Sequence, residues 1–263
     1  LINLPLIVYW MIVADFRVNK PKSQEMKNAE ECLICGAPLE YLGQPAEMEC
    51  SLCHRHFLNT VRCRNDHYVC DECHTQGIDG IMRICQEETS SNPFIIMERL
   101  MSLGTCHMHG PEHHIMVGAA LVTAFRNAGG DVDLQWGLSE MIRRGKQVPG
   151  GACGNWGACG AGISTGQFVS IVTRSNPLAS ESWGLSNLMT SEALSAIARH
   201  GGPRCCKRDS YEALRAAVRF ADEHIGVRMD IPEHIVCTRS SKNNQCLGRR
   251  CPFSMPATNK DKL

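Results

Sequence analysis

The placement of cysteine constrains this chain more than any other feature of its sequence. The 263 residues include 16 cysteines, eight before residue 90 and eight after residue 100. The first eight occur mostly in CxxC pairs, whereas the later eight lie in helical-looking sequence beside histidines and arginines. A chain this long and this apolar can fold without disulfides. The thiols therefore indicate metal or redox chemistry in a reducing compartment, and we expect a cytoplasmic protein.

Charge and hydropathy exclude several classes of partner. The formal net charge is zero, so no global field attracts nucleic acid or an acidic membrane. Segment 26–90 holds 11 acidic and 5 basic residues, which disfavours phosphate contacts. An apolar run of about 13 residues near the N-terminus is shorter than the roughly 20 that a membrane helix needs. We interpret residues 1–25 as an N-terminal extension before a natural start at Met26; the alternative is a strand or helix packed on the body.

The CxxC pairs predict a double zinc-ribbon-like module over residues 26–90. Each pair supplies two thiolates from one turn, and two turns complete a tetrahedron around zinc. In the simplest pairing, His67 or His74 could replace one ligand of the second site, and an interleaved pairing of all eight thiols stays open. The expected ligands are Cys32, Cys35, Cys50 and Cys53 for one zinc ion, and Cys63, Cys70, Cys73 and Cys85 for a second.

Residues 91–254 show the periodicity of helices rather than of strands. Helical segments are predicted over 93–103, 111–127, 134–144, 155–173, 185–200 and 210–225. The expected fold class is therefore mainly α, with a helical Cys/His-rich domain after a small β/knuckle module. Residues 255–263 are polar and are predicted to be a tail.

A histidine cluster marks the start of one of these helices. The segment TCHMHGPEHH places four imidazoles within eight residues, and neutral imidazole is a common metal ligand. We predict that His107, His109, His113 and His114 bind a metal or shuttle protons, with His109 and His113 as catalytic candidates. The alternative is that some of them cap or pack the helix.

The later cysteines predict a reactive centre. Cys153 and Cys159 lie in the glycine-rich segment GGACGNWGACGAG, and Cys159 is predicted at a helix N-terminus, where a thiolate is stabilised. Both are catalytic candidates. Basic neighbours should lower the pKa of Cys205 and Cys206 and hold an anionic substrate, unless this is only a solvated basic turn. Cys251 precedes a proline, as the last ligand of some iron–sulfur runs does. An iron–sulfur cluster would draw its ligands from Cys153, Cys159, Cys205, Cys206, Cys246 and Cys251.

Four motifs carry a family resemblance: HMHGPEHH, GACGNWGACGAG, GGPRCCKRDS and CLGRRCPF. Together they resemble an uncharacterised conserved domain of anaerobic bacteria and archaea, over residues 26–254. Members sometimes carry an S-adenosylmethionine-dependent methyltransferase region, but this chain has no strand–glycine–helix fingerprint for a nucleoside. The glycine loop is also similar to the redox-active GCAxxG cysteine family, although Cys159 stands in Ala-Cys-Gly rather than Gly-Cys-Ala.

Two functions are compatible with these patterns. The first is an iron–sulfur or thiol enzyme, an oxidoreductase or sulfurtransferase, that acts on a small anionic substrate or with a redox partner protein. The second is a non-catalytic zinc-binding adaptor or metal carrier, in which all the thiols are ligands. Broad absorption near 400 nm would favour the first function, and a colourless zinc protein the second.

Overall fold

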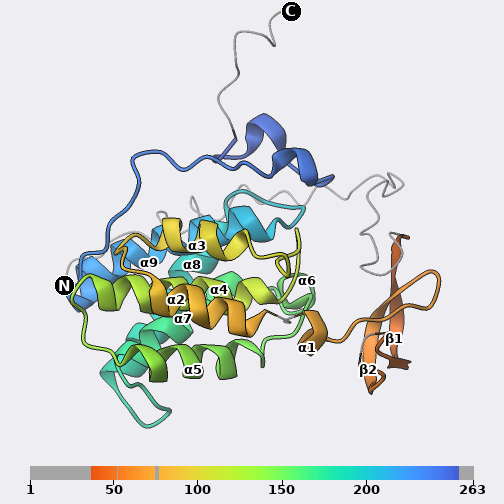
Figure 1. Cartoon of the computed structure of the whole chain (residues 1–263), viewed down its shortest axis with the longest axis horizontal. Coiled ribbons are helices and arrows are strands. Elements are labelled where there is room, and N and C mark those ends of the chain that lie inside the picture. The colour runs from red at the N-terminus through yellow and green to blue at the C-terminus, as the bar shows by residue number, and fades with distance from the viewer. Residues whose placement is uncertain (1–36, 52, 75–76, 255–263) are drawn as a thin grey trace, which may run out of the picture.

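The computed structural model describes residues 37–51, 53–74 and 77–254. A two-stranded sheet near the N-terminus precedes a body of packed helices, which confirms the expected fold class (Figure 1). The predictions for residues 1–25, for Cys32 and Cys35, and for the tail 255–263 lie outside the described residues. Within the described part of the chain, no helix combines the length and apolar character that crossing a bilayer requires.

The sheet is an antiparallel hairpin of β1 (Leu39–Glu49) and β2 (His56–Cys63). Its register runs from the pair Leu39–Cys63 to the pair Glu49–His56, with an irregularity between Tyr41 and Ala46. The hairpin and the short helix α1 (Asp71–His74) share a small core of their own, composed of Met48, Cys50, Tyr68, Cys70 and Cys73.

The helical body begins earlier than residue 91. Helix α2 (Ile78–Glu87) is amphipathic, and its buried residues Ile81, Ile84 and Cys85 are spaced three and one apart on one face. That face joins the main core, in which α2 contacts α3 (Pro93–Met101), α4 (Glu112–Asn127) and α5 (Leu134–Gly145). Residues 78–87, which the sequence assigns to the zinc module, thus pack as part of the body.

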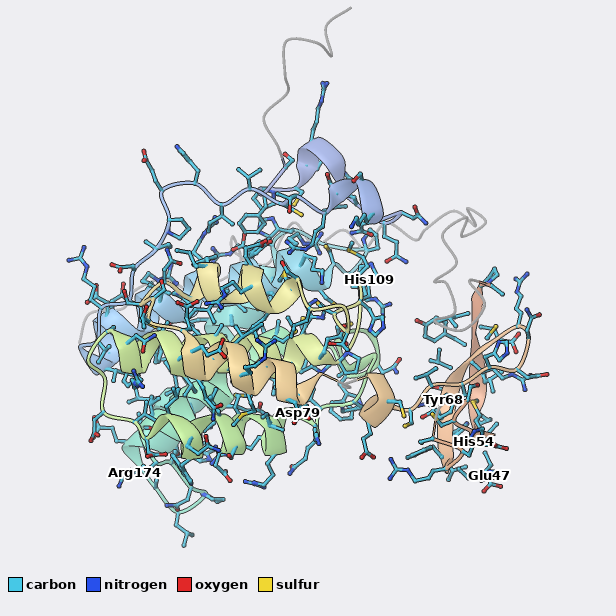
Figure 2. All side chains as sticks on the ribbon, in the orientation of Figure 1. Glu47, His54, Tyr68, Asp79, His109 and Arg174 are labelled. Carbon is cyan, nitrogen blue, oxygen red and sulfur yellow. The ribbon has the colours of Figure 1, made fainter. Side chains whose placement is uncertain are left out.

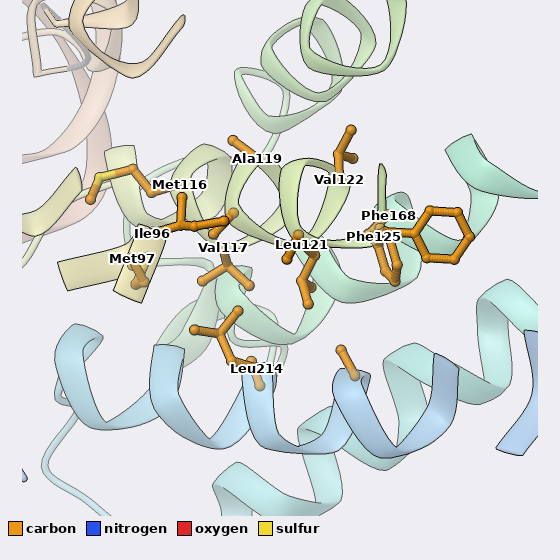
Figure 3. Close-up of a cluster of buried hydrophobic side chains, with 14 of the residues drawn as sticks. Ile96, Met97, Met116, Val117, Ala119, Leu121, Val122, Phe125, Phe168 and Leu214 are labelled. Carbon is orange, nitrogen blue, oxygen red and sulfur yellow. The ribbon is translucent and has the colours of Figure 1, made fainter. Parts of the chain in front are cut away.

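Helix α4 lies at the centre of the body and is buried along almost its whole length. It contacts α7 (Gly160–Val172) and α9 (Cys206–Ile225), and α8 (Glu181–Ala198) packs against both of those helices. Figure 3 shows Val117 and Leu121 of α4 near Leu214 of α9. The rings of Phe125 and Phe168 meet edge to face with centroids 5.6 Å apart.

The last described segment, 226–254, lies across the body and contains only short 3-10 turns. This segment is anchored by Phe253, which is fully buried. The centroid of its ring lies 5.1 Å from that of Tyr211 on α9. The N–H of Cys237 donates to the carbonyl of Phe253 at 2.7 Å. Arg239 forms an ion pair of 2.7 Å with Glu98 on α3. These contacts fix the C-terminal cysteines against the start of α9.

Candidate metal and thiol sites

Four thiols of the hairpin module meet at one point. Cys50 follows β1, Cys53 lies in the turn before β2, and Cys70 and Cys73 flank the start of α1; their four Sγ atoms lie within 4.8 Å of one another. The Sγ atoms of Cys53 and Cys70 are 3.7 Å apart. Four thiolates at about 2.3 Å from a zinc ion are about 3.8 Å from one another, so this donor set fits a tetrahedral ion.

The protonation of this group is governed by its surroundings. Burial raises the pKa of Cys70 and Cys73, so these thiols hold their protons unless a cation displaces them. Arg55 donates to Cys53 and lowers the pKa of that thiol to about 6. A metal ion would therefore displace protons from the buried pair, as structural zinc does.

This grouping differs from the simplest pairing that the sequence suggests. Cys50 and Cys53, which the sequence assigns to the first site, join Cys70 and Cys73, which it assigns to the second. Cys63 lies at the opposite end of the hairpin, where its Sγ accepts the N–H of Asn65 at 3.2 Å. Cys85 is fully buried in the helical core on α2. Its place on the apolar face of an amphipathic helix separates it from the hairpin thiols.

The histidine cluster opens α4, as predicted, but His113 is already fully engaged. Its Nδ1 donates to the carbonyl of Gly110 at 3.0 Å, and its Nε2 lies 2.8 Å from Nζ of Lys207. The same ammonium donates to Sγ of Cys106 at 3.1 Å and to the carbonyl of His107 at 2.8 Å. Lys207 is 2% exposed, and this network ties α9 to the start of α4.

The network argues against a metal at this point. Cys106, Glu112 and His113 are close enough to share an ion, yet the Lys207 ammonium lies against two of them and would repel a second cation. Burial, followed by the charge of Lys207, lowers the pKa of His113 to about 3. Burial alone would raise the pKa of Glu112, but a hydrogen bond from His107 and the influence of His113 lower it to about 2. The structure thus gives His113 a packing role.

A cleft of about 300 Å³ separates the hairpin from the helical body. Tyr68 lines it from the hairpin and His109 from the body, and Figure 2 labels both residues. Nε2 of His109 lies 3.3 Å from Oδ1 of Asn243. The body also contributes chemically active side chains to the cleft wall, namely His114, Cys153, Arg204 and Cys206.

The start of α7 lies beside this cleft. Cys153, on the short helix α6 (Ala152–Asn155), lines both the cleft and an adjoining cavity that contains Cys159 and Asp209. Cys159 is the N-cap of α7, and its Sγ lies 3.9 Å from Oδ2 of Asp209. Gly160 follows, and a Cβ there would meet the ring of His114 at 2.2 Å. Glycine at this position therefore lets an imidazole approach the first turn of α7.

His114 is oriented by its own hydrogen bond. Its Nδ1 donates to the carbonyl of Val148 at 3.1 Å, which leaves the lone pair on Nε2, the atom beside Gly160. An imidazole fixed in this way by a backbone carbonyl is the usual arrangement of a metal-binding histidine. His114 thus directs its unprotonated Nε2 toward the first turn of α7.

Burial reverses the expected acidity of the thiols. It raises the pKa of Cys159 to about 12, an effect that the carboxylate of Asp209 reinforces and that the N–H groups of Ala161 and Gly162 only partly offset. Burial likewise raises the pKa of Cys206, although Arg204 acts in the opposite direction. The sequence predicts lowered pKa values because it shows the helix start and the basic neighbours but not the loss of water.

The expected cluster ligands divide into two groups. Cys205 adopts an extended conformation as the N-cap of α9, whereas Cys206 is its first helical residue, so the two neighbours face different cavities. Cys153, Cys159 and Cys206 belong to the cleft side. The other cavity is lined by Cys205, Cys246 and Cys251 together with Cys237, which is not among the expected cluster ligands.

These features define a mainly helical, thiol-rich protein with a four-cysteine group suited to holding a metal ion. The chain belongs to the DUF5714 family, a family of unknown function, whose model matches residues 81–254. This confirms the resemblance to an uncharacterised conserved domain. No curated protein and no solved structure matches the chain.

Proposed function

We propose that this protein is a cytoplasmic metalloprotein in which the hairpin module binds structural zinc and the cleft is a thiol centre for redox or sulfur-transfer chemistry. The observation that carries the proposal is the shared wall of the cleft. Cys153, Cys206 and the basic Arg204 line one cavity, and the thiol of Cys159 opens into the adjoining one. A cavity of this size that the guanidinium groups of Arg204 and Arg62 both line suits a small anionic substrate.

The zinc ion would stabilise the hairpin side of the cleft. A two-stranded hairpin with a small core is marginal in water. Coordination by Cys50, Cys53, Cys70 and Cys73 supplies the missing stability, because binding of a structural metal is coupled to folding. The ion would have no direct part in the chemistry of the cleft.

The thiol chemistry would be exchange with an S–S bond of the substrate. The thiolate of Cys153 attacks one sulfur of that bond, and the other sulfur leaves as an anion. Cys159 then gives its proton to Asp209 and attacks Sγ of Cys153, which forms the Cys153–Cys159 disulfide and releases the second anion. The substrate gains two electrons and the thiol pair loses two. A redox partner protein or a cellular thiol returns the pair to its reduced form.

Tetrathionate, a small dianion with a central S–S bond, is a direct test. Reduced, zinc-loaded protein should release two thiosulfate ions per chain and form a Cys153–Cys159 disulfide that peptide mass spectrometry detects. Arg204→Met should slow this reaction at least fivefold but should not slow reaction with the uncharged probe 4,4′-dithiodipyridine. Arg199→Met, at the exposed end of α8, is the matched control. Failure to form this disulfide would refute the thiol-exchange step.

The raised pKa values support a second candidate function, that of a metal-binding adaptor or carrier. Thiols that burial keeps protonated, such as Cys159 and Cys206, are weak nucleophiles but good ligands once a metal displaces the proton. If this function is correct, the protein should take up zinc beyond one ion per chain and should not react with tetrathionate.

A further inference from the structure

The geometry points to an iron–sulfur cluster of the [4Fe–4S] class, bound by Cys205, Cys237, Cys246 and Cys251. The four thiols line one small cavity between the start of α9 and segment 226–254. This set omits the cleft cysteines and includes Cys237. The site is separate from the cleft, and its existence does not depend on the chemistry proposed there.

The cavity is built by long-range contacts that hold the four cysteines together. Cys205 comes from the N-cap of α9, and the side-chain amide of Asn243 donates to its Sγ at 3.4 Å. Cys237 is held by its backbone bond to Phe253, whose ring is buried against Tyr211. Segment 226–254, which has little regular structure, is thereby fixed where its three cysteines face Cys205.

Backbone N–H groups point at the sulfur atoms of this set. The N–H of Arg239 donates to Sγ of Cys237, and the N–H of Gly248 donates to Sγ of Cys246, each at 3.4 Å. The N–H of Phe253 does the same for Cys251. In each case the donor lies two residues after the cysteine. Hydrogen bonds of this kind stabilise negative charge on sulfur and tune iron–sulfur clusters.

Cys205 follows a related pattern. The backbone N–H groups of Lys207 and Arg208, in the first turn of α9, donate toward its sulfur. A helix start supplies such unpaired N–H groups. Each of the four sulfurs therefore accepts a hydrogen bond from at least one backbone N–H group.

The spacing of the sulfurs distinguishes a cluster from a single ion. The four hairpin thiols lie within 4.8 Å of one another, but no three sulfurs of the Cys205 set, all from described residues, meet that limit. A zinc ion with bonds of about 2.3 Å needs sulfurs about 3.8 Å apart. A cubic four-iron core holds its thiolates at roughly 6–7 Å. Four thiols that share one cavity but do not meet the spacing of a single ion are compatible with the larger core of a cluster.

The charge of the cavity wall also suits a cluster. The wall contains Lys207, Arg208 and Arg239 and no carboxylate. A four-iron cluster with four thiolate ligands carries a net charge of about −2 in its oxidised form. These cations, of which Arg208 also pairs with Asp209 and Arg239 with Glu98, favour a buried anion of this charge.

The position of the site suggests its use. Cys205 faces the cluster cavity and its neighbour Cys206 lines the cleft, so one peptide unit separates the two sites. If the proposed function of the cleft is correct, the cluster is placed to exchange electrons with it. This last point rests on that proposed function, whereas cluster binding does not.

The test is anaerobic reconstitution of the full chain with ferrous iron and sulfide. We expect about four iron and four sulfide ions per chain and broad absorption near 400 nm that dithionite bleaches. Cys237→Ser and Cys246→Ser should each reduce this absorption at least threefold, and the double variant should abolish it. Cys153→Ser is the matched control: it should keep the absorption and lose the reaction with tetrathionate, so the two proposals fail separately.

Circular dichroism establishes that each variant is folded. If Cys237→Ser does not fold, Cys246→Ser decides, because Cys246 lies in a loop outside the helical core. A colourless protein that binds only zinc would overturn the inference. So would a double variant that keeps the absorption, or a Cys153→Ser variant that loses it.

Discussion

Individual buried side chains decide which polar groups of this protein can act and which only hold the fold. Lys207 is the clearest example. Its ammonium is almost fully buried and has three acceptors in the segment 106–113 that faces it. The cost of burying it is offset only while all three bonds are made. His113, one of those acceptors, is kept neutral by the same surroundings. Neither residue has a free atom for substrate, although both stand in motifs rich in functional residue types.

Replacing the Lys207 ammonium with an uncharged side chain should destabilise the fold. Lys207→Met leaves the acceptors His113 Nε2 and the carbonyl of His107 buried without a donor, and it should lower the free energy of unfolding by roughly 3 kcal/mol. Lys146→Met, at an exposed position after α5, should change it by less than about 0.5 kcal/mol. Urea denaturation of both variants measures the difference. Equal stabilities would show that the buried network contributes nothing.

The depressed pKa of His113 also predicts a pH dependence. Its pKa is about 3 in the folded protein and about 6.5 in the unfolded chain. Between these values the unfolded state binds more protons, so stability falls as the pH falls through that window. Lys207, Glu112, His114 and Cys106 face this ring, and Glu112 titrates below the range that we would use.

We expect the stability of His113→Asn to fall less steeply than that of the parent between pH 6.5 and 5, by about 1 kcal/mol per pH unit. Asparagine can still donate to the carbonyl of Gly110. Urea denaturation at several pH values measures both slopes, and parallel slopes would contradict a neutral, buried His113.

At the scale of elements, close approach of helices shapes the body. Gly166 of α7 allows contact with α8, because a Cβ there would lie 1.8 Å from Oγ1 of Thr190 and 2.8 Å from the carbonyl of Ser186. Gly160 provides the corresponding space for His114. The structure thus shows close packing at both positions.

Adding one methyl group to α7 should therefore be costly. Gly166→Ala should force α7 and α8 apart and destabilise the protein by about 1–3 kcal/mol. Gly184→Ala, inside α8 with open space around its Cα, should instead stabilise it by up to about 1 kcal/mol, because alanine has the better helix propensity. If the packing is as described, thermal unfolding should show a lower Tm for Gly166→Ala and a higher Tm for Gly184→Ala.

At the scale of the whole molecule, the residues that the structure describes form two parts with separate cores. The hairpin core and the helical core share no residue, and the cleft lies between them. The hairpin depends on its four thiols, whereas the body is stabilised by a large apolar core. Loss of the metal should therefore destabilise the hairpin but not the helical body, and it should open the hairpin side of the cleft.

Cys50→Ser and Cys70→Ser should each lower the zinc content by about one ion per chain and leave the helical circular dichroism nearly unchanged. Cys32→Ser should also lower the zinc content if the second predicted ion is bound. Cys85→Ser should do the reverse: it keeps the zinc and lowers the stability of the helical body, because it places a hydroxyl in an apolar core. Metal analysis and thermal unfolding test this contrast. A loss of zinc in Cys85→Ser would show that Cys85 is a zinc ligand, as the sequence predicts.

The sequence by itself determined the helical body, the capacity of the hairpin thiols to hold a metal ion and the helix starts at Pro111 and Cys159. These follow from local periodicity, from CxxC spacing and from capping residues, all of which operate over a few positions. The amphipathic pattern of Ile81, Ile84 and Cys85 was also readable and would have placed Cys85 in the core.

Only the tertiary structure decided which thiols share a site and how acidic they are. Cys237 meets Cys205 because segment 226–254 is anchored by Phe253, a contact between residues far apart in the chain. The pKa of Cys159 is raised although it caps a helix, because burial is the larger effect. Partners and solvent exposure are properties of the assembled core, and local spacing carries no record of either.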